Sequence, residues 1–315
     1  MNQPDPCGVL VVDKPNGITS HDVVNRVRRA YQTRQVGHTG TLDPMATGVM
    51  VLCIGAATRL AEYLTACNKH YTAEFTFGSQ SDSYDTMGTI LETCDASHIT
   101  AEDVEAALQQ FKGSILQVPP MVSAVHHQGK RLYQLAREGK TVDRNPRPVV
   151  VDELRLADFT PGFAATARLE ITCSSGFYVR VLADDLGKSL RVGAVMSGLR
   201  RPWVGHSHND SFSVDRAVPF DDISTSTTCT QLLDWLVPME NAITDIPAYQ
   251  VNEQVHVDLV CNGVALPATH TVKLNALTKS TYQGTVMLFT PSGRLLAMAR
   301  EADGLFRPFK VFKAQ

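Results

Sequence analysis

The sequence predicts an α+β protein whose main sheet is mixed and largely antiparallel. Short apolar or alternating segments are separated by turn signals, and two Thr-x-x-Asp capping boxes, at Thr19 and Thr100, open helical segments. These elements do not follow the regular strand–helix alternation of a parallel sheet. At 315 residues, one large or two unequal domains are expected. We divide the chain into a main domain over 1–245 and a small β-rich domain over 246–315.

The first part of the chain predicts a turn, two helices and two strands. Residues 13–17 read Asp-Lys-Pro-Asn-Gly, which is typical of a turn, and the helix after Thr19 carries apolar residues on one face. A wholly apolar run over 49–54 predicts a buried strand, and a short helix is expected over 60–64. Apolar and polar residues alternate over 71–77, which predicts a half-buried strand.

The rest of the main domain repeats this mixture. A helix is expected after Thr100, and alternating apolar residues over 169–173 predict another strand. Ser174-Ser-Gly176 breaks that run, and a helix is expected over 181–190. Residues 207–230 are rich in Ser, Thr and Asp, so we predict a loop with little core there.

Composition excludes several classes of protein. No stretch approaches ~18 consecutive apolar residues, so no membrane-spanning helix is expected. The N-terminus lacks the basic and apolar regions of a secretory signal, which favours the cytoplasm. The seven cysteines are widely spaced without a C-x-x-C pair, which indicates reduced thiols and neither disulfides nor zinc. The histidines include no H-E-x-x-H motif, and no metal site is expected.

Charge is distributed unevenly along the chain. The formal net charge of −3 argues against general adhesion to nucleic acid. Acidic residues, however, concentrate over 71–111 and 215–245, whereas 26–34, 130–147 and 186–208 are locally basic. A solvated helix face explains any one basic stretch. Three of them make a charge-segregated surface plausible.

The loop Gly37–Gly48 has a composition that is typical of a functional site. It holds three glycines, three threonines, one histidine and the step Asp43-Pro44 before a buried strand. Pro44 biases Asp43 away from helical geometry, so the loop should hold a carboxylate at a fixed angle. A polar turn in which Asp43 bonds nearby amides is an equally good interpretation. No G-K-[ST] follows the glycines, so this is not a phosphate loop.

This loop resembles the signature of the tRNA pseudouridine synthase B family. Further blocks agree with the family in the family's order, over roughly residues 8–204. They are Asp13-Lys-Pro-x-Gly17-x-Thr-Ser20, Lys69-x-Tyr71, Gln117-x-Pro-Pro-Met-x-Ser123-Ala with Gln128-Gly-Lys130-x-Leu-Tyr133, Ser175-Gly-x-Tyr178-x-Arg180, Asp184-Asp-Leu-Gly187 and Leu199-Arg-Arg201. The C-terminal region is similar only in length, position and β-like texture to the family's PUA-type RNA-binding domain.

The resemblance implies a function and a domain plan. It implies isomerisation of uridine to pseudouridine at position 55, in the T-loop of tRNA, without metal or cofactor. The expected partner is the T-stem–loop of tRNA, bound by a monomer that needs no obligate protein partner. Residues 1–245 would form a catalytic domain of the pseudouridine synthase type, with an RNA-contacting insertion over 119–150. Residues 246–315 would form a PUA-like RNA-binding domain.

The resemblance also implies roles for single residues. Asp43 matches the essential aspartate, Tyr71 the stacking tyrosine and Arg180 the arginine that keeps the aspartate ionised and aimed. The expected substrate-binding residues are His38, Arg59, Tyr178, Leu199, Lys130 and Arg131. Arg59 departs from the lysine that is common at its position.

Several roles stay open at this point. Asp43 could attack the sugar, attack carbon 6 of the base, or remove a proton from the ribose. From the residues alone, a tyrosine such as Tyr71 more often serves ordinary packing of its strand, and an arginine such as Arg180 more often lies at the surface. Tyr178 and Leu199 fit a role in core packing as well as a role in the pocket wall. Lys14 is expected to hold the N-terminal motif in place more than to contact RNA.

Other classes of function compete with this one. A non-enzymatic tRNA-folding chaperone would need the basic stretches alone, and a synthase acting on ribosomal RNA within a guide-RNA particle would share the motifs. A glycosidase with Asp43 and Asp85 as paired carboxylates needs a separation that sequence does not give. Activity on free tRNA without partner proteins separates these hypotheses.

Overall fold

The computed structural model describes residues 6–123, 125–127, 129–206, 211–277, 282 and 284–312. Its main feature is a 10-stranded sheet of order β14-β1-β3-β12-β4-β11-β10-β7, with β2 beside β3 and β13 beside β12. Its strands are β1 (Gly8–Lys14), β2 (Val36–His38), β3 (Thr47–Ile54), β4 (Asn68–Phe77), β7 (Gly113–Gln117), β10 (Arg147–Thr160), β11 (Thr166–Cys173), β12 (Ala194–Gly205), β13 (Ser211–Ser213) and β14 (Val218–Pro219).

Most neighbouring strands of this sheet run antiparallel; β3 with β12 and β1 with β14 are the parallel pairs. Two small hairpins lie outside it, β5 (Ser79–Ser81) with β6 (Ile90–Thr93) and β8 (His126–His127) with β9 (Lys130–Arg131). The predicted mixed, largely antiparallel α+β fold is therefore confirmed. The helices are α1 (Ser20–Ala30), α2 (Ala61–Ala66), α3 (Ala101–Leu108), α4 (Leu132–Arg137), α5 (Val179–Ser189), α6 (Cys229–Asp234) and α7 (Gln254–Cys261).

The capping boxes start their helices as predicted. At both Thr19 and Thr100 the hydroxyl accepts the backbone N–H of the aspartate three residues on, and that carboxylate accepts the threonine's own N–H. Each box satisfies two backbone donors that a helix start otherwise leaves open. The following apolar residues, Val23 and Val104 among them, are buried against the sheet.

The apolar run over 49–54 is buried because β3 is covered on both faces. Met50 and Leu52 belong to the core beneath α1, α3 and α5. Val49 and Val51 belong to a second cluster with α2 and residues of the C-terminal region. Successive side chains of a strand point to opposite faces, so only a strand with two covered faces is apolar throughout.

The prediction of a loop with little core over 207–230 is wrong for the described part of that segment. β13 pairs with β12, β14 pairs with β1, and Ile223 is fully buried. These strands are too short to show an alternating pattern, and their pairing comes from distant segments. Residues 207–210 lie outside the described residues.

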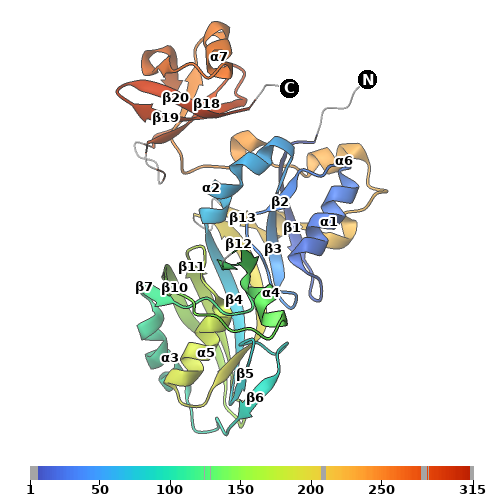
Figure 1. The fold of residues 1–315 in the computed structure, drawn as a ribbon, viewed down its shortest axis with the longest axis vertical. Helices are drawn as coiled ribbons and strands as arrows, with labels where there is room; N and C mark the ends of the chain where they lie inside the picture. The colour runs from blue at the N-terminus through green and yellow to red at the C-terminus, as the bar shows by residue number, and fades with distance from the viewer. Residues whose placement is uncertain are drawn as a thin grey trace.

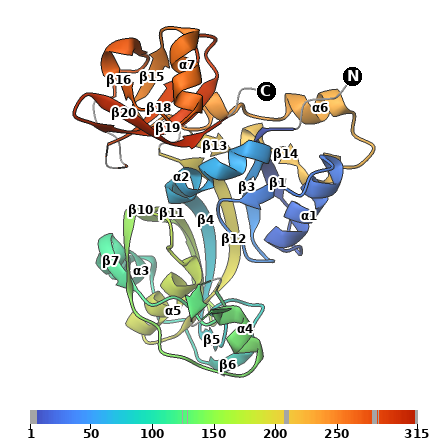
Figure 2. The ribbon, with the colours of Figure 1, turned by 45° about the horizontal axis from the view of Figure 1, so that its top comes forward.

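The C-terminal region forms its own six-stranded sheet, of order β16-β20-β19-β18-β15-β17, at one end of the molecule (Figures 1 and 2). Its strands are β15 (Ala248–Val251), β16 (Leu266–Pro267), β17 (Thr271–Lys273), β18 (Thr285–Phe289), β19 (Leu295–Ala302) and β20 (Leu305–Val311). The prediction that the C-terminal region is rich in β-strands is confirmed. Met287 and Met298 pack into the same cluster as Leu60 and Leu64, so the two regions share a core. The boundary at 245/246 stays an interpretation.

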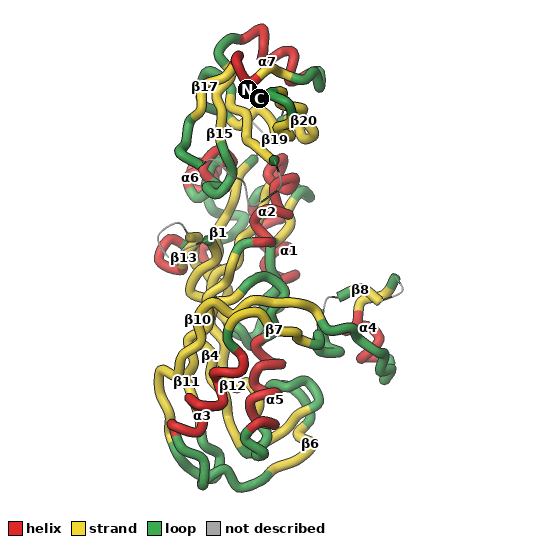
Figure 3. The backbone as a smooth tube through the Cα atoms, turned by 90° about the vertical axis from the view of Figure 1, so that its left-hand side faces the viewer, coloured by secondary structure: helices red, strands yellow, loops and turns green. Residues whose placement is uncertain are grey.

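The segment between β7 and β10 covers most of the range 119–150 predicted as an RNA-contacting insertion, a role that stays a prediction. In Figure 3, β8 and α4 extend away from the body of the molecule on one side. The base of this insertion returns to the body, where Arg144 donates a hydrogen bond to the Pro119 carbonyl at 3.0 Å. Within the described ranges, the helices are all too short or too polar to cross a membrane.

Candidate active site

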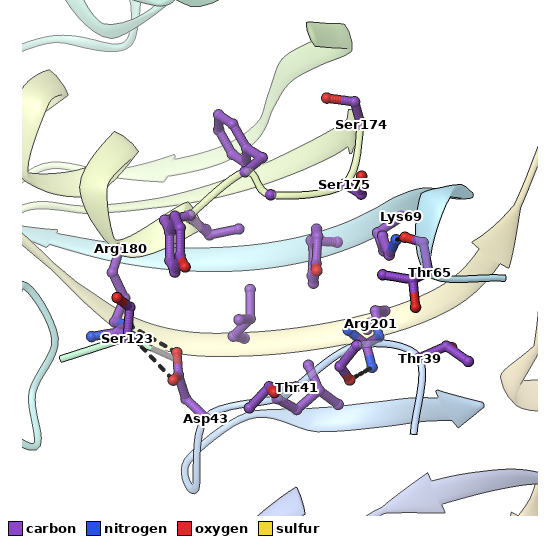
Figure 4. A pocket seen from close by; sticks show the side chains of 18 of the residues that line it. Thr39, Thr41, Asp43, Thr65, Lys69, Ser123, Ser174, Ser175, Arg180 and Arg201 are labelled. Carbon is purple, nitrogen blue, oxygen red and sulfur yellow. Dashed lines mark hydrogen bonds and ion pairs between the residues drawn. The ribbon is translucent and has the colours of Figure 1, made fainter. Parts of the chain in front are cut away.

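A cavity of about 230 Å³ opens beside the loop between β2 and β3 (Figure 4). Asp43 comes from that loop, Tyr71 from β4, Tyr178 and Arg180 from the start of α5, and Leu199 from β12. These five residues are separated by up to 156 positions, yet they line one cavity. The structure thus brings together the three predicted catalytic residues and two of the predicted substrate-binding residues.

Asp43 and Arg180 form a bidentate ion pair. Nε of Arg180 lies 2.8 Å from Oδ2 of Asp43, and an Nη2 bond of 3.1 Å reaches Oδ1. The Arg180 side chain is 4% exposed and that of Asp43 29% exposed, so the carboxylate faces the cavity while the guanidinium lies behind it. Parallel bonds of this kind fix the plane of a carboxylate as well as its charge.

Arg180 is itself fixed by three segments. It donates to the Ser83 carbonyl at 3.1 Å and to the Val122 carbonyl at 2.9 Å, and its Nε lies 3.7 Å from Oδ2 of Asp85. The arginine therefore ties Asp43 to the loop before β6 and to the base of the insertion. A movement of the insertion would therefore also move the Asp43 carboxylate.

Opposing effects set the ionisation of Asp43. Burial raises the pKa of its carboxyl, the charge of Arg180 lowers it, and the neighbouring carboxylate of Asp85 raises it. Asp85 is buried and accepts hydrogen bonds from the Ser83 hydroxyl and the Met87 N–H. Asp43 is thus a partly desolvated carboxylate whose charged form is stabilised chiefly by Arg180, with a smaller contribution from Lys14.

Lys14, which is expected to hold the N-terminal motif in place, also holds the Asp43 loop in shape. This side chain is fully buried, and its ammonium donates to the carbonyls of Pro15 (3.0 Å), Pro44 (3.1 Å) and Ala46 (2.6 Å). Burial lowers the pKa of Lys14 to about 8. Ser20 adds two bonds to the Leu42 backbone, one given and one accepted.

Lys14→Met is therefore expected to destabilise the protein and to misplace Asp43. The apolar side chain leaves loop carbonyls without a donor, which costs about 1–3 kcal/mol of unfolding free energy. Urea unfolding measures this loss of stability. The catalytic rate at the cavity should also fall, because Asp43 is misplaced. Lys112→Met, which removes an exposed lysine, serves as the matched control. Equal stability of the two variants would contradict the role given to Lys14.

Gly48 is required by the close approach of two strands. Its φ is +103°, and a Cβ added there would lie 2.3 Å from the Arg201 carbonyl oxygen. β3 and β12 run parallel at this point, with Gly48 opposite Arg201. Only glycine allows this contact, which brings Arg201 beneath the Asp43 loop.

Tyr71 lies at the wall of the cavity. It is 8% exposed, and its alternating strand places it on the same face as Lys69. Burial raises the pKa of the Tyr71 phenol, and the charge of Arg201, whose guanidinium carbon is 6.0 Å from the ring centroid, opposes that rise. Tyr71 therefore offers a ring face and a protonated hydroxyl.

Gln117 positions the segment that precedes Arg180. Its side-chain amide accepts a bond of 2.7 Å from the Tyr178 N–H and donates one of 3.1 Å to the Tyr178 carbonyl. Tyr178 precedes the first residue of α5 and makes no side-chain cap bond, so Gln117 supplies the fixed geometry there.

Three of the remaining predicted binding residues, His38, Arg59 and Lys130, are not among the described residues that line the cavity. His38 is on β2, half-buried, opposite Leu52. Arg59 donates to the Val311 carbonyl at 2.5 Å and stacks 5.0 Å from the Phe312 ring, so it contacts the C-terminal region. Lys130 is exposed on the insertion and pairs with Glu138 at 3.1 Å.

The side chain of Arg131 lies outside the described residues. RNA contacts by these four residues stay predictions. Within the described ranges, no three or more His, Cys, Asp or Glu side chains are grouped as metal ligands would be.

Sequence reasoning assigned no role to Lys69 or Arg201, although both line the cavity. The signal was present, because each is two residues from a predicted site residue on the same strand, Lys69 from Tyr71 and Arg201 from Leu199. Residues i and i+2 of a strand share a face. Val122 and Ser123 of the insertion also line the cavity, and no sequence pattern reveals that they fold back onto it.

Comparison with known proteins first gives the class. Residues 28–179 match the model for the N-terminal domain of the TruB family of pseudouridylate synthases. The fold agrees: a solved structure of a Cbf5–Nop10–Gar1 complex superposes with a TM-score of 0.73 at 23% identity, covering 99% of this chain and 88% of that chain. An archaeal box H/ACA Nop10–Cbf5 complex gives 0.71, also at 23% identity, covering 99% and 89%. The family model gives the class as pseudouridylate synthase, and the fold agrees with it.

Closer relatives give the family. The tRNA pseudouridine synthase B of Symbiobacterium thermophilum is 46% identical over 258 residues, which cover 82% of each chain. That of Dehalococcoides mccartyi (strain BAV1) is 38% identical over 311 residues, covering 98% of this chain and 97% of the relative. This chain belongs to the tRNA pseudouridine synthase B family.

Proposed function

We propose that this protein isomerises uridine to pseudouridine in tRNA and that its target is uridine 55 of the T-loop. The observation that carries the proposal is the bidentate Asp43–Arg180 pair at the wall of a cavity that also holds Tyr71, in a chain of this family. The three residues act together as the catalytic set. The proposal extends to a monomer that acts in the cytoplasm without a protein partner.

The geometry suits an exchange of one glycosidic bond for another. The bond between N1 of uracil and C1′ of ribose breaks, the base turns, and carbon 5 bonds to C1′. The proton of carbon 5 leaves and N1 gains one, so the product is an isomer. Asp43 is an aimed carboxylate at the cavity wall and serves as nucleophile or base. Tyr71 presents a ring face to the base during its rotation.

The target must leave the T-loop to reach Asp43. Extruding a base costs a few kcal/mol, which stacking and hydrogen bonds in the pocket offset. Tyr178 and Leu199 supply apolar walls to the cavity. We assign His38 to organising the extruded nucleotides, since it lies on β2 just before the Asp43 loop.

The insertion over 119–150 and the C-terminal region are the proposed RNA contacts outside the cavity. Lys130 is exposed on the insertion, which stands clear of the body, and Arg131 follows it. Arg59 lies where the C-terminal region meets the catalytic domain, so an RNA there would touch both. We assign residues 246–315 to accessory, PUA-like RNA binding.

Affinity for tRNA is expected to fall steeply with salt. Phosphate contacts by lysines and arginines release counterions, and several of them lower affinity roughly tenfold or more between about 50 mM and about 200 mM salt. Filter binding of one tRNA transcript across this range measures the slope. A flat response would show that the basic stretches do not meet phosphates.

The function itself is tested with purified enzyme and an unmodified tRNA transcript, with no other protein or RNA present. Chemical mapping of pseudouridine should find one modified position, in the T-loop at 55. Modification of a fragment of ribosomal RNA but not of tRNA would favour the guide-particle alternative. A tRNA that refolds faster with the protein yet stays unmodified would favour the chaperone alternative.

A further inference from the structure

Two buried cations line the cavity away from the catalytic ion pair. Lys69 on β4 is 5% exposed and Arg201 on β12 is 2% exposed. In Figure 4 they lie together near Thr65 and Thr39, whereas Asp43 and Arg180 lie at the other end of the view. The cavity therefore has one end where charge is paired and one end where it is positive.

The hydrogen bonds of these two cations go to uncharged acceptors and leave donors unused. The Lys69 ammonium donates to the carbonyls of Thr65 (2.6 Å) and Cys67 (2.5 Å), which leaves one of its N–H groups. Arg201 donates from Nε to the Val49 carbonyl (2.7 Å) and from Nη2 to the Gly40 carbonyl (3.0 Å). Arg201 also bonds the Tyr71 phenol, and the remaining N–H groups of its guanidinium are left for a ligand.

No carboxylate neutralises this pair. Among the residues that the structure describes, no carboxylate oxygen lies within 4.0 Å of a nitrogen of Lys69 or Arg201. The other two buried cations at the site differ. Arg180 has Asp43 beside it, and Lys14 has three carbonyl acceptors for its three N–H groups. Burying a cation without a counterion is costly, so the positive end of the cavity favours an anion.

A nucleotide that enters this cavity brings one kind of permanent anion. Uracil and ribose are neutral, whereas each flanking phosphodiester carries a full negative charge. We propose that Lys69 and Arg201 form a binding site for one of the two phosphates that flank the target uridine. The proposal rests on the function proposed above. Hydroxyl groups of Ser174 and Ser175 line the same cavity and can add hydrogen-bond donors.

The site carries its own pH dependence. Burial lowers the pKa of Lys69 to about 8, and the charge of Arg201 adds to this effect. The other titratable groups facing it are the thiols of Cys67 and Cys173 and the phenol of Tyr71. Burial raises the pKa of Cys173 to about 12, so that thiol stays neutral at pH 9. A bound phosphate favours protonated Lys69, so affinity should fall as the pH rises through 8.

The test uses a T-stem–loop RNA in which a neutral methylphosphonate replaces one phosphate at a time. Binding is measured to Asp43→Asn protein, so that the target uridine stays unreacted, with and without Lys69→Met. At one of the two flanking linkages the methylphosphonate should weaken binding roughly ten- to hundredfold, as expected for a lost hydrogen bond to a charged group. With Lys69→Met, the same replacement should have almost no further effect.

Controls separate this site from general electrostatics. Lys112→Met removes an equal but exposed charge and should keep the full methylphosphonate penalty. A methylphosphonate in the lower stem should weaken both proteins alike. If Lys69→Met does not fold, Lys69→Gln keeps a donor for the Thr65 and Cys67 carbonyls. The Asp43→Asn protein with Lys69 intact gives a further readout: its affinity for all-phosphate RNA should fall about tenfold from pH 7 to pH 9, and that for the sensitive methylphosphonate RNA should not.

The outcomes are distinguishable. Failure of the all-phosphate RNA to bind would refute the proposed function. Normal binding with no special effect at either flanking linkage, or a full penalty retained by Lys69→Met, would overturn the phosphate site alone. So would a Lys69→Met enzyme, with Asp43 intact, that binds RNA normally but isomerises it slowly, because that result places the pair on the uracil oxygens.

Discussion

Asp43→Asn should lower the rate of pseudouridine formation at least about 10³-fold and leave the fold intact. Asparagine has nearly the same shape and can still accept a bond from Arg180, but it is neither a nucleophile nor a base. Single-turnover assays with saturating enzyme isolate this step from tRNA binding. Binding of tRNA should change by less than about tenfold, since the carboxylate contributes to chemistry more than to affinity.

Asp95→Asn is the matched control. Asp95 is exposed, and its Oδ1 accepts the Ser97 N–H at 2.8 Å, a bond that asparagine can retain. This variant should react at the rate of the unsubstituted enzyme. Full activity of Asp43→Asn would remove Asp43 from the mechanism, and with it the assignment of the cavity as the active site.

Replacing Arg180 should have the second largest effect. Arg180→Lys keeps a charge but cannot hold both oxygens of Asp43 and the carbonyls of Ser83 and Val122 at once, so a loss of about 10²-fold is expected. Arg180→Met removes the charge and should lose more. It also leaves Asp43 and Asp85 without their shared cation, so its unfolding free energy should drop by about 3–5 kcal/mol.

The pH profile distinguishes this role from a general loss of fold. Arg180 lowers the pKa of Asp43 against the effect of burial, so without it that pKa rises further. If the ionised carboxylate is the active form, the acidic limb of the rate profile of Arg180→Met, which removes the charge, should move to higher pH. An unshifted limb in a folded variant would show that Arg180 does not control the ionisation of Asp43.

Local signals in the sequence predicted much of the fold. The capping boxes at Thr19 and Thr100 and the alternation over 71–77 depend on neighbouring residues, and the structure confirms them. The short strands after residue 210 were missed because their partners, β1 and β12, are far away in the chain. Short segments carry too little pattern to predict pairing of this kind.

The site likewise has features that local motifs predict and features that depend on the tertiary fold. Motifs located Asp43, Tyr71 and Arg180, but their meeting in one cavity depends on the order β3-β12-β4 in the sheet, which no motif states. Arg59 is a similar case. The resemblance implies a substrate-binding role, which stays a prediction, whereas the contact of its guanidinium with Val311 of the C-terminal region is visible only in the structure.

The most direct test is a crystal structure of the Asp43→Asn protein bound to a T-stem–loop RNA. We expect the uridine at position 55 outside the loop stack and inside the cavity, with its base against Tyr71 and its C1′ beside residue 43. An RNA bound elsewhere on the protein, or a uridine that remains stacked in its loop while the cavity is empty, would contradict the assignment of this cavity as the site of uridine isomerisation.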